Sequence, residues 1–443
     1  MKTIDTESNG DLSSVRMKKI IFKLILFMRA FLLMPVCLFK TLFVGKKSTG
    51  KNILVIEAGL PYKDRDGASR QRWEMLLLIR KLGYNVSYLD TLHIIEPAIY
   101  GEIPVHNKEV GVFSLLKKIL NYRKGQKRIL KEMKKNGIRH LSHLHTFKIF
   151  RRFWAKRNAK KIDYVFMCHP ENYRAFTKLG EFKYSKVIYE VCDIYHLRFK
   201  AEYDLTGCER VYGVYKKYKE LEEGIFESPK IDTILSVSQK EVELIKKFAP
   251  GKQVLTIPVR ISDFSIEPNY SYEDRKDILF LGAHNRCNLD AVEFYINEIL
   301  PHVDKGIKLK LAGSAFKKDD DRYISSQIEV LGPLSNDELK DIYSFVRITI
   351  IPIRFGAGVK GKTVEALSSK IPIVSTSFGL EGIPNIEEVY SSIDSPKEFA
   401  EEINKMYFDR SRCEELGSKG YECVKKYISI ENAEKTYSEI FSK

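Results

Sequence analysis

The feature that most constrains this chain is the stretch 348–382, which reads ITIIPIRFGAGVKGKTVEALSSKIPIVSTSFGLEG. An apolar, β-branched run at 348–353 predicts a buried strand, and 371–375 predicts a second one. Between them lie a glycine-rich loop and a helix that we expect to start at Thr363, with Glu365 in its first turn. A second glycine loop follows the second strand. This order of elements predicts a βαβ unit.

The glycine-rich loop has the composition of an anion site. Its three glycines let the backbone approach a ligand closely and direct several N–H groups toward it. The following helix N-terminus adds partial positive charge, and Lys360 and Lys362 add two full charges. We therefore expect a diphosphate here. Glu365 does not suit a phosphate, but its carboxylate suits a neighbouring pair of hydroxyls such as those of a ribose.

Loop composition alone also fits an ordinary βαβ unit with solvated lysines. The spacing is more specific: PxRxGxGxKxKxxEA, a strand ending in Ser or Thr, then GxEG, resembles the donor-site signature of retaining nucleotide-sugar glycosyltransferases of the GT-B class. This resemblance implies an α/β GT-B fold, with two doubly wound Rossmann-like domains facing a cleft. The donor-binding residues that it implies in this stretch are Arg354, Gly356, Gly358, Lys360, Lys362, Thr363, Glu365 and Glu381.

Length and charge agree with such a protein. A chain of 443 residues is long enough for two domains, each with its own core. The net charge of +16 favours anionic partners such as a membrane surface, nucleic acid or phosphorylated substrates. The seven cysteines are scattered and include no CxxC pair, which indicates free thiols in a reducing compartment. No metal-ligand spacing is convincing.

Residues 1–50 are predicted to hold a polar tail and an amphipathic helix. The segment 17–44 is apolar, but lysine or arginine interrupts it at 23, 29 and 40, so no apolar run is long enough to span a bilayer. The pattern favours a helix in the interface of an anionic membrane. A signal peptide and a helix packed on the protein's own core are the alternatives. We expect a cytoplasmic protein held peripherally on the inner face of the plasma membrane.

Residues 51–89 have the order strand, loop, helix, glycine, strand, which opens a doubly wound domain. The loop segment 66–70 resembles a DRDxGS-R loop of bacterial relatives in the same glycosyltransferase group. That resemblance makes Gly67, Ser69 and Arg70 candidates for an acceptor or phosphate loop. The alternative is a helix N-cap at Asp66 or Ser69.

The segment 117–161 is strongly basic, with Glu132 as its only acidic residue. It suggests a second membrane-facing or acceptor-facing surface, and solvated helices are the alternative. Nucleic-acid binding is possible in principle. Histidines 140, 143 and 145 have no acidic or thiol partner nearby in the sequence, so we predict no metal site.

Two polar residues follow predicted strands of the first domain. His169 ends the strand at 162–168, and Asp193 follows the strand at 186–191. Ligands bind at the carboxyl ends of parallel strands in such folds. The family resemblance gives both a catalytic role: His169 close to the transferred sugar, and Asp193 orienting or deprotonating the acceptor hydroxyl. For His169, an ordinary loop histidine is the alternative.

The polar segment 256–276 is predicted to link the two domains, and a strand at 277–282 opens the second. We expect an acceptor-side domain over 51–265, a nucleotide-sugar domain over 270–410, and a C-terminal helix over 411–443 that crosses back to the first domain. The segment after this strand resembles the family's segment in which loop groups approach the donor phosphates. It makes Gly282, Arg286 and Asn288 further donor-binding candidates.

The implied reaction transfers a sugar from a nucleoside diphosphate sugar to an acceptor hydroxyl with retention of configuration. We expect no cofactor and no metal, since Lys and Arg would neutralise the diphosphate. The acceptor is predicted to be a lipid-linked or membrane-proximal glycan, as in polysaccharide biosynthesis. Ala357 stands at a position where many members of the resembled family have a glutamate. A GT-B nucleotide-sugar epimerase and a non-catalytic protein that binds nucleotide-sugar or nucleic acid are the alternatives, although no nucleic-acid partner is expected.

Overall fold

The computed structural model describes residues 50–62, 67–91, 112–141, 154–180, 182–260, 270–318, 320–323 and 325–442. The predicted membrane helix, residues 261–269 of the predicted linker, and histidines 143 and 145 lie outside these ranges. Contacts divide the described chain into two units. Unit 1 holds the residues up to Pro61 and from Leu76 to Tyr189, and unit 2 holds Tyr62–Met75 and Glu190 onward. The predicted domain limits at 265, 270 and 410 stay predictions.

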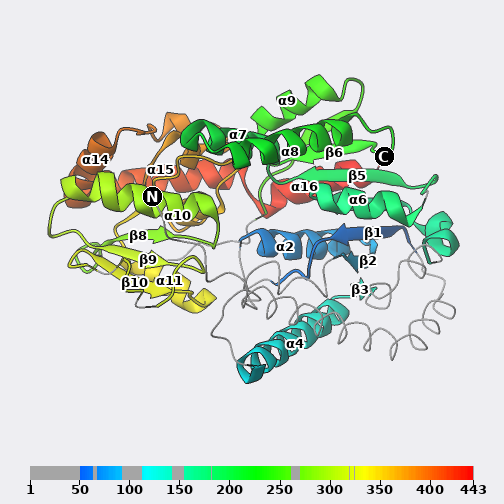
Figure 1. Ribbon diagram of the computed structural model, residues 1–443, viewed down its shortest axis with the longest axis horizontal. Helices are drawn as coiled ribbons and strands as arrows, with labels where there is room; N and C mark the ends of the chain where they lie inside the picture. Colours follow the sequence, from blue (N-terminus) through cyan, green and yellow to red (C-terminus); the bar gives the residue numbers. More distant parts are fainter. Residues whose placement is uncertain are drawn as a thin grey trace, which may run out of the picture. The chain divides into compact units, whose positions relative to one another are not determined.

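A seven-stranded parallel sheet has the order β3-β2-β1-β4-β5-β6-β7. Its strands are β1 (Asn52–Glu57), β2 (Asn85–Asp90), β3 (Arg139–His140), β4 (Tyr164–Cys168), β5 (Lys186–Val191), β6 (Thr233–Ser236) and β7 (Gln253–Thr256). The helices are α2 (Gly67–Lys81), α4 (Val112–Lys135), α6 (Pro170–Leu179), α7 (Tyr195–Thr206), α8 (Glu209–Glu227) and α9 (Gln239–Phe248). Figure 1 shows α7 and α8 side by side, and they pack on one another.

A five-stranded parallel sheet has the order β10-β9-β8-β11-β12. Its strands are β8 (Ile278–Leu281), β9 (Leu309–Ala312), β10 (Ile328–Gly332), β11 (Ile348–Ile351) and β12 (Ile373–Ser375). The helices are α10 (Arg286–Phe294), α11 (Asn336–Phe345), α12 (Gly361–Ser368), α13 (Ser377–Leu380), α14 (Pro396–Phe408), α15 (Arg410–Tyr427) and α16 (Ile430–Ser442). One hydrophobic cluster joins β8–β11 to α10 and α14.

Both sheets reverse their strand order at one point, between β1 and β4 and between β8 and β11. Ligands of open α/β sheets bind beyond the carboxyl ends of the strands at such a reversal. The residues that follow β4 and β8 therefore lie at these reversals, and so does the glycine-rich loop that follows β11. His169, Gly282 and the 352–360 loop are all at one of the two reversals.

Several predicted boundaries were wrong, and the differences bear on the site. Helix α2 begins at Gly67, so Gly67, Ser69 and Arg70 lie in a helical turn and not in a loop. Helix α12 begins two residues before Thr363, which moves Glu365 into its second turn. Part of the second glycine loop forms the short helix α13. Local propensity is a weak guide to where a helix begins, because tertiary contacts override it.

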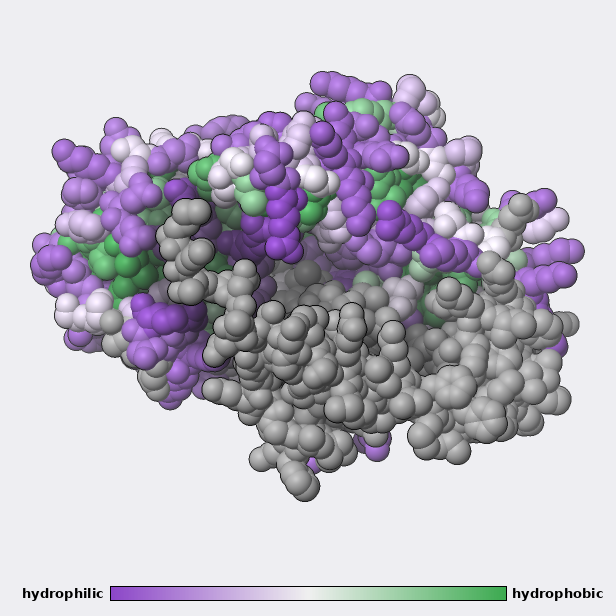
Figure 2. Space-filling view, in the orientation of Figure 1, coloured by the Kyte–Doolittle hydropathy of each residue, from purple (hydrophilic) through white to green (hydrophobic). Residues whose placement is uncertain are grey.

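The predicted C-terminal helix is in fact two helices, α15 and α16, and β7 ends at Thr256, the first residue of the predicted linker. Within the described residues, no helix is long and apolar enough to cross a membrane. The six described cysteines are free thiols. Figure 2 shows that the coloured part of one face is mostly hydrophilic, with hydrophobic residues in smaller patches. Among the described residues, the large exposed hydrophobic side chains are Tyr184, Leu205, Tyr270 and Phe408.

Candidate functional site

The glycine-rich loop after β11 leads directly into the N-terminus of α12. Gly356 has a φ of 155° and Gly358 a φ of 67°. The second value lies in a region that residues with a side chain rarely adopt. Thr363 in the first turn of α12 is buried, and its hydroxyl donates to the Gly379 carbonyl at 2.8 Å. The second glycine segment is thereby attached to α12, so the loop, the helix N-terminus and residues 379–382 form one local structure.

Lys362 lies in the first turn of α12 and reaches α10. Its ammonium donates to Asn288 Oδ1 and lies 4.4 Å from the centroid of the Phe280 ring. Asn288 is itself oriented, because its Nδ2 donates to the Ala283 carbonyl at 2.7 Å. Burial lowers the pKa of Lys362 to about 8. A partly desolvated cation beside a helix N-terminus attracts an anion strongly, since both effects act in the same direction.

Glu365 is buried on α12 and forms an ion pair with Arg70 of α2. Arg70 Nη1 lies 3.1 Å from Glu365 Oε1, and Arg70 Nη2 donates to Asn336 Oδ1 at 3.3 Å. Burial raises the pKa of Glu365 above its ordinary value, although Arg70 and Lys362 act in the opposite direction. The structure therefore brings the predicted acceptor-loop arginine onto the predicted donor-binding glutamate.

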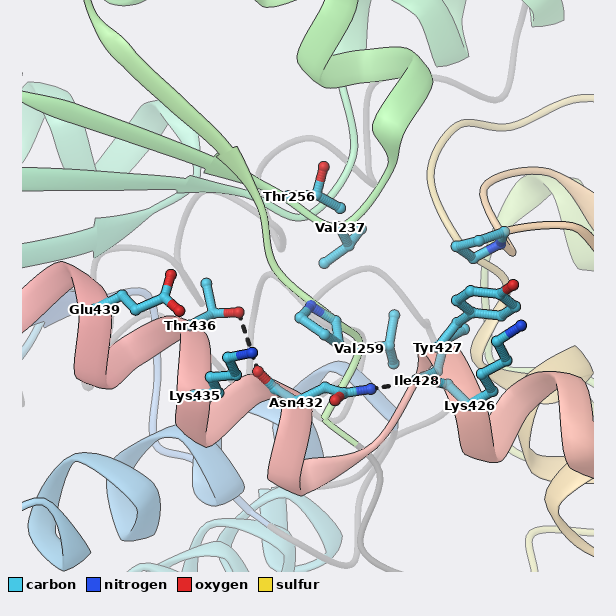
Figure 3. A pocket seen from close by; sticks show the side chains of 12 residues that line it. Val237, Thr256, Val259, Lys426, Tyr427, Ile428, Asn432, Lys435, Thr436 and Glu439 are labelled. Carbon is cyan, nitrogen blue, oxygen red and sulfur yellow. Dashed lines mark hydrogen bonds between the residues drawn. The ribbon is translucent and has the colours of Figure 1, made fainter.

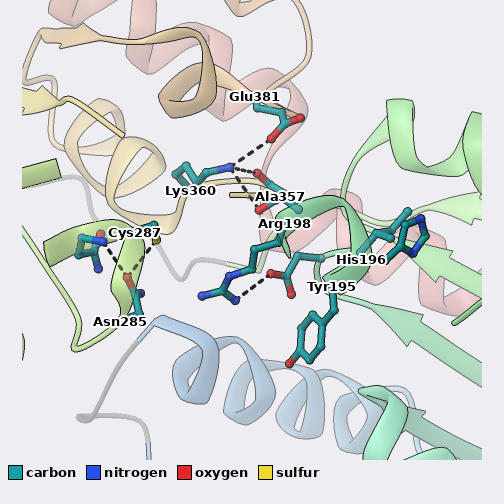
Figure 4. Close-up of polar contacts among 12 residues, drawn as sticks. Tyr195, His196, Arg198, Asn285, Cys287, Ala357, Lys360 and Glu381 are labelled. Carbon is teal, nitrogen blue, oxygen red and sulfur yellow. Dashed lines mark hydrogen bonds and ion pairs between the residues drawn. The ribbon is translucent and has the colours of Figure 1, made fainter. Parts of the chain in front are cut away.

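Lys360 curls back over its own loop (Figure 4). Its ammonium donates to the carbonyls of Ala357 and Gly358, at 3.2 and 2.7 Å, and to Glu381 Oε2 at 3.3 Å. These bonds connect the glycine-rich loop to the residue that follows α13. An anion entering this loop would meet Lys360 with its charge already shared with Glu381.

The turn after β5 packs on the glycine-rich loop. A Cβ at Gly358 would lie 2.7 Å from the Cys192 carbonyl oxygen and 3.1 Å from the Asp193 Cβ. Asp193 forms an ion pair with Arg198 of α7, with 3.3 Å between Oδ2 and Nη1 (Figure 4). Burial raises the pKa of Asp193, and Arg198 and then Lys360 offset part of that rise. A carboxylate with a raised pKa can accept a proton, so the predicted role of Asp193 is chemically reasonable.

Two predicted donor-binding arginines are engaged in ion pairs. Arg354 binds Asp290 of α10 with both Nε and Nη2, at 3.0 and 2.6 Å. Arg286, on the first turn of α10, pairs with buried Glu202 of α7, although the Arg286 side chain is 63% exposed. Arg354 therefore connects the glycine-rich loop to α10. The exposed guanidinium of Arg286 retains open faces for a further anion.

Gly282 follows β8 and accommodates a tight crossing. A Cβ on Gly282 would lie 3.0 Å from the Phe316 ring, and a Cβ on Gly313 only 2.3 Å from the Gly282 carbonyl oxygen. Packing therefore requires glycine at Gly313, while a side chain at Gly282 would press on the Phe316 ring. Ser69 is buried in α2, where Arg72 Nη2 lies within 3.3 Å of its hydroxyl.

His169 belongs to unit 1, where it precedes α6 at the end of β4. Its φ of 66° is unusual for a residue with a side chain. Strained backbone of this kind costs roughly 1–3 kcal/mol and is often found at functional sites. The backbone carbonyl of His169 accepts from the Asn172 N–H at 3.1 Å.

A cavity of about 370 Å³ lies elsewhere in unit 2 (Figure 3). Lys426 and Tyr427 come from the end of α15, and Asn432, Lys435 and Thr436 come from α16. Apolar side chains, among them Val237, Val259 and Ile428, line the rest of it. None of the residues predicted from the sequence to form the functional site line this cavity.

Sequence reasoning did not identify several residues that shape the site. Asn336 bonds Arg70, Asp290 binds Arg354, and Glu202 pairs with Arg286. Two buried glutamates, Glu222 and Glu241, accept hydrogen bonds from the turn that follows Asp193. The only available signal was Glu241 at the third position after Ser238, which is typical of a helix cap and not of a site.

Comparisons with known proteins agree with this arrangement. Residues 275–409 match the family model described as Glycosyl transferases group 1. This segment is similar to a Glycosyl transferases group 1 domain. Over 240 residues the chain is 28% identical to an uncharacterized 44.6 kDa protein in the cps region of Klebsiella pneumoniae. That match covers 50% of this chain and 59% of the relative, so the chain spans less than two thirds of that protein.

Solved structures show the fold. A variant of S. aureus TarM, in complex with Fondaparinux, alpha-GlcNAc-glycerol and UDP, has a TM-score of 0.61 at 13% identity, with 89% of this chain and 100% of that chain covered. Sucrose-phosphate synthase from Thermosynechococcus elongatus has a TM-score of 0.59 at 13% identity, with 89% and 98% covered. Anabaena Alr3699/HepE in complex with UDP-glucose has a TM-score of 0.55 at 10% identity, with 89% and 100% covered. The predicted GT-B fold is confirmed.

Proposed function

We propose that this protein is a glycosyltransferase that moves a sugar from a nucleoside diphosphate sugar to an acceptor hydroxyl, with retention of configuration. The observation that carries the proposal is the arrangement on α12. Lys362 lies in the first turn beside the glycine-rich loop, and Glu365 lies buried in the next turn. In the proposal, Lys362 is the cation that binds the diphosphate, and Glu365 is the carboxylate that binds the ribose hydroxyls. The similarity of 275–409 to a Glycosyl transferases group 1 domain supports it.

In the proposed reaction the nucleoside diphosphate is the leaving group, and its charge grows as the glycosidic bond breaks. Lys362, the N–H groups at the start of α12 and the exposed guanidinium of Arg286 would stabilise that charge. No metal is required for this task in the proposal. We assign no protein nucleophile; the leaving phosphate takes the proton of the acceptor hydroxyl. Asp193 orients that hydroxyl, and His169 lies near the transferred sugar.

We further propose that the acceptor is a lipid-linked or membrane-proximal glycan of a surface polysaccharide. The relative from a cps region and the glycan ligands named with TarM support a polysaccharide acceptor. The predicted amphipathic segment 17–44 and the net charge of +16 support a peripheral location on an anionic cytoplasmic membrane surface.

The test is a thermal-shift panel of nucleoside diphosphates and nucleotide sugars on the wild type and on Glu365→Ala. A ligand that binds the native state raises the melting temperature by mass action. We expect one nucleotide sugar to stabilise the wild type and to lose this effect in the variant. If no member of the panel stabilises a wild type that is shown to be folded, the proposal is wrong. Product analysis by NMR with the stabilising donor then reports the anomeric configuration.

A further inference from the structure

The Ser-x-x-Glu segments at Ser335 and Ser238 each begin a helix in unit 2, and the structure uses them differently. At Ser335, the start of α11, a complete capping box forms: the Ser335 N–H donates to Glu338 Oε2 at 2.7 Å, and the Glu338 N–H donates to Ser335 Oγ at 3.3 Å. At Ser238, the start of α9, the side chain forms no cap. Glu241, the matching glutamate, is only 5% exposed. A buried carboxyl needs hydrogen-bond partners, so Glu241 must serve another group.

Glu241 has one partner in the turn between β5 and α7 and one at the end of β6. Its Oε1 accepts from the Ile194 N–H at 3.2 Å, and its Oε2 accepts from the Ser236 hydroxyl at 2.7 Å. Glu222 of α8 continues the pattern, because it accepts from the Tyr195 and His196 N–H groups, both at 2.8 Å. The backbone N–H groups of three consecutive residues at the start of α7 therefore donate hydrogen bonds to two buried glutamates.

The turn that these glutamates hold is the surface on which the glycine-rich loop rests. Gly358 has no room for a side chain against the Cys192 carbonyl and the Asp193 Cβ. The start of α9 contacts the second glycine segment, since a Cβ on Gly382 would lie 3.4 Å from the Ser238 Cβ. Any movement of Ile194 would shift Cys192 and Asp193, and with them the support of Gly358.

We propose that Glu241 is a positioning residue of the candidate donor site, which holds the Cys192–Asp193–Ile194 turn against Gly358. Glu241 acts through the backbone and touches no substrate. Its role in shaping the loop is independent of what the loop binds; the consequence for donor affinity rests on the proposed function.

The charges around Glu241 explain why a carboxyl can occupy this place. Asp193 from the β5–α7 turn and Glu381 after α13 are its acidic neighbours. Asp193 in turn faces Arg198, Lys360 and Glu222. Burial, with Asp193 and Glu381, raises the pKa of Glu241 to about 8, so the group is neutral at pH 7. Above that value it adds a negative charge beside Asp193 and Glu381, which opposes the binding of an anionic donor.

The first experiment uses the full chain without ligand. Hydrogen exchange is compared for the wild type, Glu241→Ala, Glu241→Gln and the matched control Glu338→Ala. We expect Glu241→Ala to speed exchange about tenfold or more in segments 192–196 and 356–360. Glu241→Gln, which keeps an acceptor for Ile194, should stay near the wild type, and Glu338→Ala should change only α11. Unchanged exchange of 356–360 in Glu241→Ala would overturn the proposal.

The second experiment measures the affinity of the same proteins for UDP by calorimetry. Glu241→Ala should weaken binding about tenfold, and Glu241→Gln should match the wild type one pH unit below the Glu241 pKa. One pH unit above it, Glu241→Gln should bind more tightly than the wild type by about threefold, since it carries no added charge. A ratio that stays the same at both pH values contradicts the charge argument.

The two experiments separate the two proposals. If the wild type binds neither UDP nor any other nucleoside diphosphate while Glu241→Ala still loosens 356–360, the positioning role stands and the proposed function fails. If Glu241→Ala does not fold, Glu241→Leu takes its place in both experiments, because leucine fills the buried site but offers the Ile194 N–H no acceptor.

Discussion

Arg70 and Glu365 are 295 residues apart in the sequence and form an ion pair at 3.1 Å in the structure. Arg70 lies in the first turn of α2, and Glu365 lies in the second turn of α12. Both side chains are largely buried, at 11% and 7% exposed, so water solvates neither charge well. The pair attaches the segment after β1 to the helix that carries the candidate donor site.

Removing both partners should destabilise the protein less than the sum of the two single removals. Arg70→Ala leaves a buried carboxylate without its guanidinium, and we expect a loss of about 3 kcal/mol in the free energy of unfolding. Arg70→Ala combined with Glu365→Ala should cost clearly less than the sum of the single changes. Urea unfolding of the four proteins measures this coupling. Simple additivity would show that the pair contributes nothing.

Gly358→Ala should distort the glycine-rich loop. The position has a φ of 67°, and a Cβ there would lie 2.7 Å from the Cys192 carbonyl oxygen. We expect a loss of about 1–3 kcal/mol in stability together with weaker donor binding. Gly361→Ala is the matched control, because no heavy atom lies within 4 Å of its added Cβ. Thermal unfolding with and without nucleotide distinguishes them, and equal effects of both variants would contradict this account.

Lys362 should make donor binding depend on pH. Its pKa of about 8 means that the ammonium is charged below that value and loses its charge as the pH rises through it. Affinity for a nucleoside diphosphate should therefore fall as the pH rises through about 8. Lys362→Met should lower affinity about 10- to 100-fold at pH 7, since a charge-assisted hydrogen bond is lost, and should make the pH profile shallower. Calorimetry over this range is the measurement.

The effect of Lys362 on stability has the opposite sign. Its pKa is lower in the folded protein than the ordinary value of 10.5, so the unfolded chain binds more protons between these two values. Without ligand, the contribution of Lys362 to the free energy of unfolding therefore increases from about pH 8 to pH 10.5. Denaturant unfolding of wild type and Lys362→Met checks the sign, and a fall unique to the wild type would refute it.

Tyr437→Phe should loosen the attachment of α16. The Tyr437 hydroxyl donates to Glu190 Oε2 at 3.0 Å and accepts from Arg260 Nη1 at 2.8 Å, and Arg260 Nη2 lies 2.6 Å from Glu190 Oε1. All three side chains are buried. Loss of the hydroxyl leaves both partners incompletely bonded, and we expect a cost of about 1–3 kcal/mol. Urea unfolding measures it. Tyr421→Phe on α15, a half-buried tyrosine outside this cluster, should have little effect.

Deletion of residues 1–46 should abolish membrane association if the predicted amphipathic helix is responsible. The full chain should sediment with vesicles that contain anionic lipid and should be released by high salt, because much of the attraction is electrostatic. The shortened chain should remain in the supernatant. Neutral vesicles are the control. Sedimentation of the shortened chain with anionic vesicles would show that another surface binds the membrane.

The succession of strands along the chain and the position of the glycine-rich loop could be predicted, because both depend on local sequence patterns. β1, β5, β10 and β11 coincide with apolar runs that are visible in the sequence. The anion-binding character of residues 356–362 also follows from neighbours in the chain. Helix starts were less predictable: α2 and α12 begin before the expected residues, since tertiary contacts override local propensity.

The sequence by itself determined the βαβ succession, the glycine-rich loop and the cations that follow it, because each of these depends on residues that adjoin one another. Only the tertiary structure decided the partners of the buried charged groups. Arg70 pairs with Glu365, and Arg354 pairs with Asp290. Glu241 accepts a hydrogen bond from the Ile194 N–H instead of capping its own helix. A buried charge needs a partner, but local sequence does not say which distant segment supplies it.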